Sequence, residues 1–181
     1  MNDVFLAGPI DFQDISDLAD YRLRMKRAVE NAGFSAIDQY SEALDIITDS
    51  DGVINIEEVA KNIHRLPDEP YLEAVHEASM ATSMNQVLAD PSIIPEYTSE
   101  NVIDSIVERD LELLSESDLL LAYLPQPSCG TAIEIFWAHK YNIPSVVIST
   151  SPPHFVQYFT NHICRGLNES IRILEEIQLE D

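Results

Sequence analysis

Positive charge is scarce in this sequence. Only 10 of its 181 residues are Lys or Arg, against 32 Asp or Glu, and the formal net charge is −22. Because a surface this acidic repels the phosphate backbone, the composition argues against DNA or RNA polymers as partners. An excess of acid with only three lysines also suits a protein adapted to high salt, a hypothesis that the composition alone supports.

Cysteine and long apolar runs are scarce as well. Two cysteines, Cys129 and Cys164, are too few for a disulfide framework, which favours a cytoplasmic location. No apolar run approaches the roughly 18–20 residues that a membrane-spanning helix needs. No basic region precedes the first apolar stretch, so we expect no signal peptide. With 45% hydrophobic residues, the chain is long enough for one domain with a sizeable core.

Familiar cofactor and metal motifs are missing. There is no Gly-x-Gly-x-x-Gly and no Walker loop, so neither a dinucleotide nor a triphosphate is indicated. The histidines contain no His-Glu-x-x-His pair. Residues 49–58 resemble a calcium loop, but placing Gly52 at the sixth loop position puts Ile47 at the first, where an oxygen ligand is required. We therefore expect no metal and no cofactor.

The most informative stretch is residues 117–150. The apolar run Leu119–Leu124 predicts a buried strand, and the Pro- and Gly-containing segment 125–130 predicts a loop. Apolar spacings of three and four from Thr131 to Tyr141 predict a helix, and Ser145–Ser149 reads as a second buried strand. Strand–helix–strand units of this kind build parallel sheets.

The rest of the chain repeats this alternation. Strands are expected at 3–7 and 34–37, and helices at 16–33, 57–63, 71–84, 100–115, 154–158 and 167–177. The pattern predicts an α/β fold, a doubly wound parallel sheet flanked by helices. We expect one domain over residues 1–181, with a helical insertion or lid around 41–95.

Glu134 is the first candidate catalytic residue. In open parallel sheets, ligands bind beyond the carboxyl ends of the strands, where Ser128, Gly130 and Glu134 are expected. The positive end of the helix dipole favours an ionised carboxylate there, and the backbone N–H groups of residues 129–132 suit an anion such as phosphate. The alternative is that Glu134 is an ordinary acidic residue near a helix start.

Asp110 is the second candidate. It follows Val107 by three residues and precedes Leu114 by four, which places it on or beside the buried face of its helix. A carboxylate there needs a partner, and Arg109 is available. The alternative is a purely structural role. Two carboxylates beside a sugar are able to cleave a glycosidic bond, one attacking C1′ while the other helps the leaving group depart.

Four segments together resemble the nucleoside 2-deoxyribosyltransferase family, and within it the branch of (deoxy)nucleoside 5′-monophosphate N-glycosidases. They are Phe5-Leu6-Ala7-Gly8-Pro9, Glu108-Arg109-Asp110-Leu111-Glu112-Leu113-Leu114, Ser117-Asp118, and Gln126-Pro127-Ser128-Cys129-Gly130-Thr131-Ala132-Ile133-Glu134. The resemblance implies a flavodoxin-like sheet and a homodimer or higher homo-oligomer. It also implies that Glu134 forms a glycosyl-enzyme intermediate.

The resemblance implies further roles for single residues. Asp110 assists with the proton, Ser128 binds the 5′-phosphate beside Gly130, and Gly8 with Pro9 lines the base and sugar. Asp38, just beyond a predicted strand, is a candidate for contacting the base.

Three functions remain open on this resemblance. The first is an N-glycosidic hydrolase of nucleoside 5′-monophosphates, and the second is a 2-deoxyribosyltransferase that exchanges bases. The third is a nucleotide-binding protein without activity. In each case the expected partner is a small nucleotide or nucleoside, with no membrane.

Overall fold

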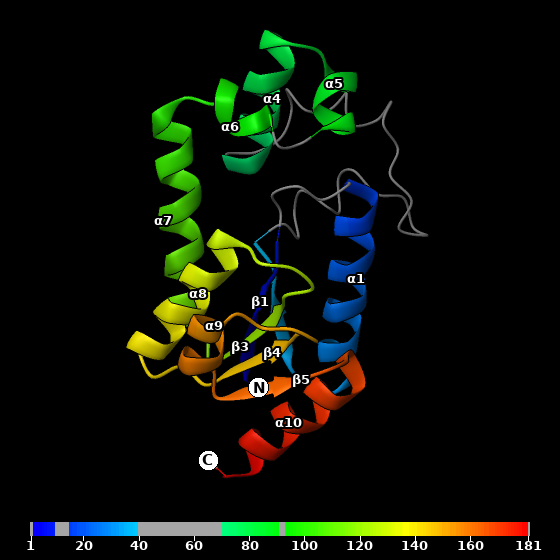
Figure 1. Cartoon of the computed structure of the whole chain (residues 1–181), viewed down its shortest axis with the longest axis vertical. Coiled ribbons are helices and arrows are strands. Elements are labelled where there is room, and N and C mark those ends of the chain that lie inside the picture. The colour runs from blue at the N-terminus through cyan, green and yellow to red at the C-terminus, as the bar shows by residue number, and fades with distance from the viewer. Residues whose placement is uncertain (1, 10–14, 40–69, 91–92, 181) are drawn as a thin grey trace. The chain divides into compact units, whose positions relative to one another are not determined.

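The computed structural model describes residues 2–9, 15–39, 70–90 and 93–180. The chain divides into two compact units (Figure 1). The first comprises Met1–Pro9, Arg22–Asp38 and Leu111–Asp181, and the second comprises Ile10–Tyr21 and Gln39–Asp110. One domain with an insertion over 41–95 stays a prediction. The predicted helix at 57–63 and the calcium-like stretch at 49–58 lie outside the described residues.

The first unit is built on a five-stranded parallel sheet. Its strands are β1 (Asp3–Ala7), β2 (Ser35–Ile37), β3 (Leu119–Tyr123), β4 (Ser145–Ile148) and β5 (His162–Cys164). Their order is β2-β1-β3-β4-β5, with every neighbouring pair parallel. This is the flavodoxin-like order. The α/β class predicted from the sequence is confirmed. The prediction missed β5, whose three residues include a single aliphatic side chain, that of Ile163.

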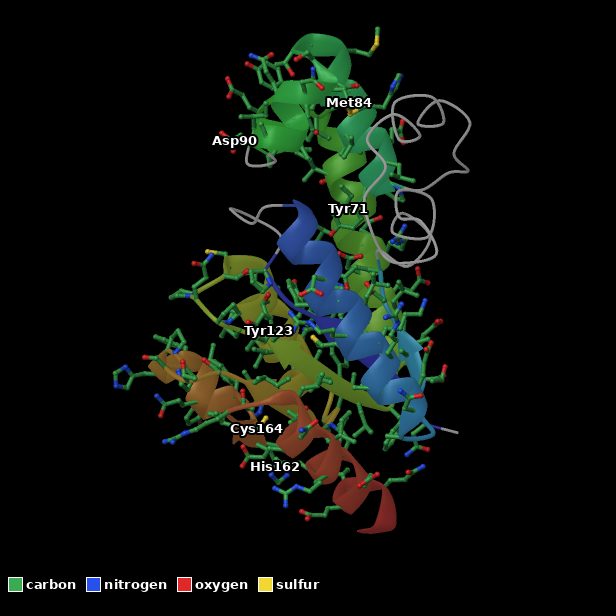
Figure 2. All side chains as sticks on the ribbon, turned by 90° about the vertical axis from the view of Figure 1, so that its right-hand side faces the viewer. Tyr71, Met84, Asp90, Tyr123, His162 and Cys164 are labelled. Carbon is green, nitrogen blue, oxygen red and sulfur yellow. The ribbon has the colours of Figure 1, made fainter. Side chains whose placement is uncertain are left out.

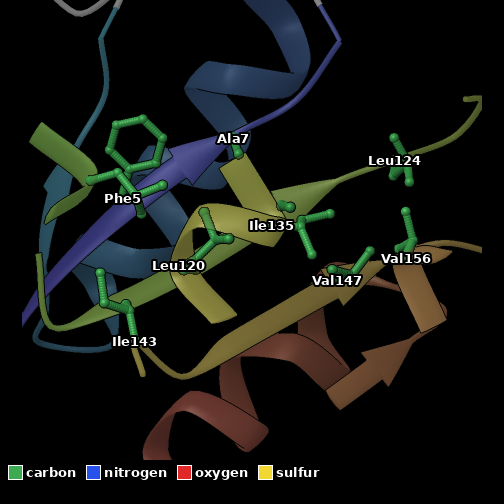
Figure 3. Close-up of a cluster of buried hydrophobic side chains, with 11 residues drawn as sticks. Phe5, Ala7, Leu120, Leu124, Ile135, Ile143, Val147 and Val156 are labelled. Carbon is green, nitrogen blue, oxygen red and sulfur yellow. The ribbon is translucent and has the colours of Figure 1, made fainter. Parts of the chain in front are cut away.

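Side chains alternate across the sheet, as the strand geometry requires. One face carries Phe5, Leu120 and Val147, which lie in a cluster with helix α8 (Cys129–Lys140) and with Val156 of α9 (His154–Phe159) (Figure 3). The buried members of that cluster are Phe5, Ala7, Leu114, Leu120, Ala122, Leu124, Ile135, Ala138, Ile143, Val147 and Val156.

The opposite face carries the alternate residues, such as Val4, Leu121 and Val146, all fully buried. Helix α10 (Leu167–Glu180) packs against β4 and β5 there. The part of α1 (Ile15–Asn31) that belongs to this unit lies on the same side as α10 (Figure 1). Helices on both faces make the sheet doubly wound, so its strands read as continuous apolar runs.

The carboxyl ends of the five strands meet at one edge. Gly8 follows β1, and the loop that leads to α8 follows β3. The connection from β1 leads to β2 on one side of the sheet, and the connection from β3 leads to β4 on the other side, so the connections diverge between β1 and β3. This switch point is where open α/β sheets bind ligands.

The second unit is helical in its described residues. It contains α4 (Pro70–Ala81), α5 (Met84–Ala89), α6 (Ile94–Tyr97) and the part of α7 (Glu100–Glu116) that ends at Asp110. The helix predicted at 71–84 is α4, which ends three residues earlier, at Ala81. The Ser83 side chain then accepts a hydrogen bond from the Gln86 N–H at 3.3 Å and caps the start of α5.

No helix in the described segments combines the length and the apolar character needed to cross a membrane.

Candidate active site

A buried ion pair lies directly behind the carboxyl edge of the sheet. Arg22 Nη1 donates to Asp38 Oδ1 at 2.7 Å, and both side chains are 1% exposed. The same guanidinium donates to the carbonyl oxygens of Leu6 at 3.3 Å and Gly8 at 3.4 Å. Arg22 therefore ties the end of β1 to the residue that follows β2. Contact between Asp38 and a base stays a prediction, with the Asp38 carboxylate held by Arg22.

The sequence analysis missed Arg22. It lies three residues before Met25 and seven before Val29, both buried, so an arginine occupies the apolar stripe of α1. An arginine in an apolar stripe is the sequence signal that could have indicated a buried ion pair. It is ambiguous because a long arginine on such a stripe commonly extends its charged head to water.

The start of α8 is capped by Ser128. This residue has extended backbone angles, and its Oγ accepts from the Thr131 N–H at 3.4 Å and from Thr131 Oγ1 at 3.3 Å. The Ala132 N–H donates to the Ser128 carbonyl at 3.1 Å. The prediction that four consecutive amides are open to an anion is therefore wrong for Thr131 and Ala132, whose N–H groups are used by the cap and the first helical bond.

The first two amides of α8, those of Cys129 and Gly130, remain as candidate donors to an anion. Cys129 and Gly130 are exposed, and their N–H groups have no acceptor within the described parts of the chain. A Cβ atom placed on Gly130 would meet nothing within 4 Å. Two neighbouring amides at the positive end of a 12-residue helix, with open space above them, are suited to bind an anion.

Glu134 lies on the inner side of this helix. It is 7% exposed and shares its face with Thr131, Ile135 and Ala138, all buried. Helix α8 packs against β3 and β4, so this face is turned toward the sheet. An ionised carboxylate is costly to bury, and an ordinary acidic residue near a helix start stays in water. The burial of Glu134 therefore favours a functional role over the solvated alternative.

Asp110 belongs to the second unit. It is 8% exposed, which confirms the predicted burial, and its Oδ2 accepts a hydrogen bond from the Tyr71 hydroxyl at 2.8 Å. Tyr71 lies on α4 and is labelled in Figure 2. The Arg109 guanidinium carbon lies 5.9 Å from the centre of the Tyr71 ring, and Arg109 Nη2 donates to the Gln39 carbonyl. Arg109, predicted as the partner of Asp110, thus lies over the ring of Tyr71, and Tyr71 donates the hydrogen bond to Asp110.

The sequence analysis missed Tyr71 as a neighbour of Asp110. The two residues are 39 positions apart, and no spacing rule connects α4 with α7. The other predicted site residues, Gly8, Pro9, Asp38, Ser128, Gly130 and Glu134, all belong to the first unit. Gly8 and Pro9 are buried there, and their role in lining a site stays a prediction.

Metal ligands and the buried thiol of Cys164 also bear on the chemistry available to the described residues. No three His, Cys, Asp or Glu side chains among the residues described are placed to hold a metal ion. Burial raises the pKa of the Cys164 thiol, labelled in Figure 2, and its Sγ donates to the Val147 carbonyl at 3.6 Å. Cys164 therefore stays protonated and is a core residue.

Comparison with known proteins establishes the fold. The sequence matches no protein-family model, and no curated protein matches it significantly. A 2-deoxyribosyltransferase from Bacillus psychrosaccharolyticus has a similar structure, with a TM-score of 0.55 and 11% identity over 92% of this chain and 88% of that chain. A conserved protein from Enterococcus faecalis V583 has a TM-score of 0.58 and 15% identity over 97% and 98%.

A weaker similarity joins this chain to a CMP N-glycosidase of Clostridium botulinum. Its TM-score is 0.44, with 13% identity over 96% of this chain and 98% of that chain. At these identities the first two comparisons support the architecture alone, and the chemistry rests on the residues themselves.

Proposed function

We propose that this chain is an N-glycosidic hydrolase that cleaves a (deoxy)nucleoside 5′-monophosphate into free base and (deoxy)ribose 5-phosphate. The observation that carries the proposal is the buried carboxylate of Glu134, on the same helix whose first two amides have no acceptor among the described residues and whose Gly130 has open space beside it. A carboxylate and an anion site near the switch point of a parallel sheet suit a substrate that combines a glycosidic bond with a phosphate.

In the proposed first step, the Glu134 carboxylate attacks C1′ of the sugar. A bond forms between C1′ and a Glu134 oxygen while the bond between C1′ and the base nitrogen breaks, and its electron pair leaves with the base. Asp110, in its acid form, gives the base a proton. We assign this role to Asp110 from its sequence motif alone.

In the second step, water attacks C1′ and releases the Glu134 carboxylate. The proton of the water returns to Asp110, which restores the enzyme. Ser128 and the amides of Cys129 and Gly130 bind the 5′-phosphate in this proposal. Gly8 and Pro9 line the base and sugar, with Asp38 nearby. We further propose that the enzyme is a cytoplasmic homo-oligomer.

A 2-deoxyribosyltransferase is the second candidate. Gly130-Thr131-Ala132-Ile133-Glu134 resembles the transferases more than the hydrolases. The similarity to a 2-deoxyribosyltransferase structure fits the same reading. The first step is then unchanged, and an incoming base takes the place of water in the second. The choice depends on how well the closed site excludes water.

The test is a chromatographic turnover assay at low and at multimolar KCl. Each ribo- and deoxynucleoside and each 5′-monophosphate is incubated with and without a foreign free base. Base released from a monophosphate without acceptor is the expected result. A new nucleoside that forms only with acceptor would establish the transferase. Nucleotide binding without either product would favour the binding protein without activity.

A further inference from the structure

Arg22 is a fully buried charged residue that the proposed reaction does not use. Its side chain is 1% exposed, and so is that of its ion-pair partner Asp38. Replacing a buried ion pair by apolar residues of similar volume is often neutral or stabilising, because both charges lose their hydration. Stability alone therefore does not explain why two charges occupy this position, and the other contacts of the guanidinium become informative.

The end of β1 extends beyond its neighbour β2. Pairing with β2 ends where Phe5 lies opposite Ile37, whereas pairing with β3 continues for two more residues of β1. The Asn2 carbonyl accepts a hydrogen bond from the first residue of β2, so carbonyls at even positions along this stretch point toward β2. The next even-numbered carbonyls beyond the paired region are those of Leu6 and Gly8.

Arg22 donates hydrogen bonds to both of these carbonyls. Its Nη1 lies 3.3 Å from the Leu6 oxygen, and its Nη2 lies 3.4 Å from the Gly8 oxygen. The same Nη1 donates to Asp38 Oδ1 at 2.7 Å. A guanidinium holds its N–H donors in one rigid plane, so acceptors that it binds at the same time are fixed relative to one another. The carbonyl of Gly8 is thereby fixed relative to Asp38, which follows β2.

We propose that Arg22 is a positioning residue, which holds the Gly8–Pro9 segment where that segment lines the base and sugar of the substrate. The inference rests on the proposed function, and Arg22 acts in it through this segment without touching the substrate. The segment contacts the substrate before and during the reaction alike, so its displacement weakens binding and leaves kcat largely unchanged. The phosphate, bound in the proposal by the start of α8, should be held as before.

Calorimetric binding of nucleoside 5′-monophosphates and of inorganic phosphate tests this role, in a Glu134→Gln parent protein that does not consume the nucleotide. Arg22→Lys and Arg22→Gln both lose the planar set of donors, but only the lysine keeps a charge beside Asp38. Both should weaken monophosphate binding about 10-fold at a temperature where each is folded, and leave phosphate binding within about twofold. Their thermal unfolding midpoints should differ, with that of Arg22→Gln lower. Arg24→Gln, at an exposed position of α1, is the matched control and should bind like the parent.

Equal binding losses in two variants of unequal stability would support positioning, because a purely structural role lowers the midpoint and not the affinity of the folded protein. Unchanged monophosphate binding in both Arg22 variants would overturn the inference and leave the proposed reaction intact. Phosphate binding that falls as much as monophosphate binding would also overturn it. If the wild type releases no base while nucleotide binding still depends on Arg22, the reaction fails and the positioning role stands. Absence of nucleotide binding in the parent would overturn both.

Discussion

The two proposed catalytic carboxylates reach their positions in different ways. Glu134 is placed by a continuous stretch of chain, in which Ser128 caps the helix and Ile135 and Ala138 anchor its inner side. Asp110 is buried to a similar degree, yet its hydroxyl partner Tyr71 comes from another helix 39 positions away. A site built from one segment is readable in the sequence, and one built from distant segments is not.

The largest effect is expected from Glu134→Gln. This substitution keeps the size of the side chain and removes the nucleophile, so turnover should fall at least about 1,000-fold while nucleotide binding stays within a fewfold. Turnover is measured by chromatography and binding by calorimetry. Glu116→Gln, at the exposed end of α7, is the matched control and should behave like the wild type. Undiminished turnover in Glu134→Gln would remove this residue as nucleophile.

Arg22→Met tests how much the stability of the first unit depends on the ion pair between Arg22 and Asp38, which are 16 positions apart. The change leaves the Asp38 carboxylate buried without its cation, and the unfolding free energy should fall by about 3–5 kcal/mol. Denaturant unfolding provides the measurement. Arg24→Met, an exposed position on the same helix, should stay within about 0.5 kcal/mol of the wild type. If the two variants lost equal stability, the buried ion pair would not be a specific source of the stability of this unit.

Tyr71→Phe tests whether the distant partner of Asp110 matters for the proposed reaction. Only the hydroxyl that donates to Asp110 is lost, so kcat should fall about 10-fold with KM within about twofold. Tyr97→Phe, a 39% exposed tyrosine of α6, is the control that should leave both constants unchanged. If the wild type is active and Tyr71→Phe has an unchanged kcat, Tyr71 does not position Asp110. That outcome would leave the proposed reaction itself intact.

Ser128→Ala has the smallest expected effect on stability, about 1 kcal/mol, because it removes one helix cap. It should also weaken monophosphates more than nucleosides, as measured by KM for each. Ser83→Ala removes the cap of α5 and should lower stability similarly without changing that preference. Equal losses for monophosphates and nucleosides in Ser128→Ala would mean that this loop does not bind phosphate.

The sequence by itself determined the local features of the first unit. Apolar runs placed β1, β3 and β4, and helical spacing after the Pro- and Gly-containing loop placed α8 with Glu134 near its start. These features follow from hydrophobic period, turn residues and capping, which act between residues close in the chain. The parallel direction of the strands also followed, since strand–helix–strand connections build parallel sheets.

Only the tertiary structure decided the rest. It showed that Arg22 reaches across β1 to Asp38, that Tyr71 meets Asp110, and that the amides of Thr131 and Ala132 are already used. It also revealed β5. One physical reason explains why the sequence did not predict these side-chain contacts. A buried polar group must find a partner, and which distant residue supplies that partner depends on how the elements pack.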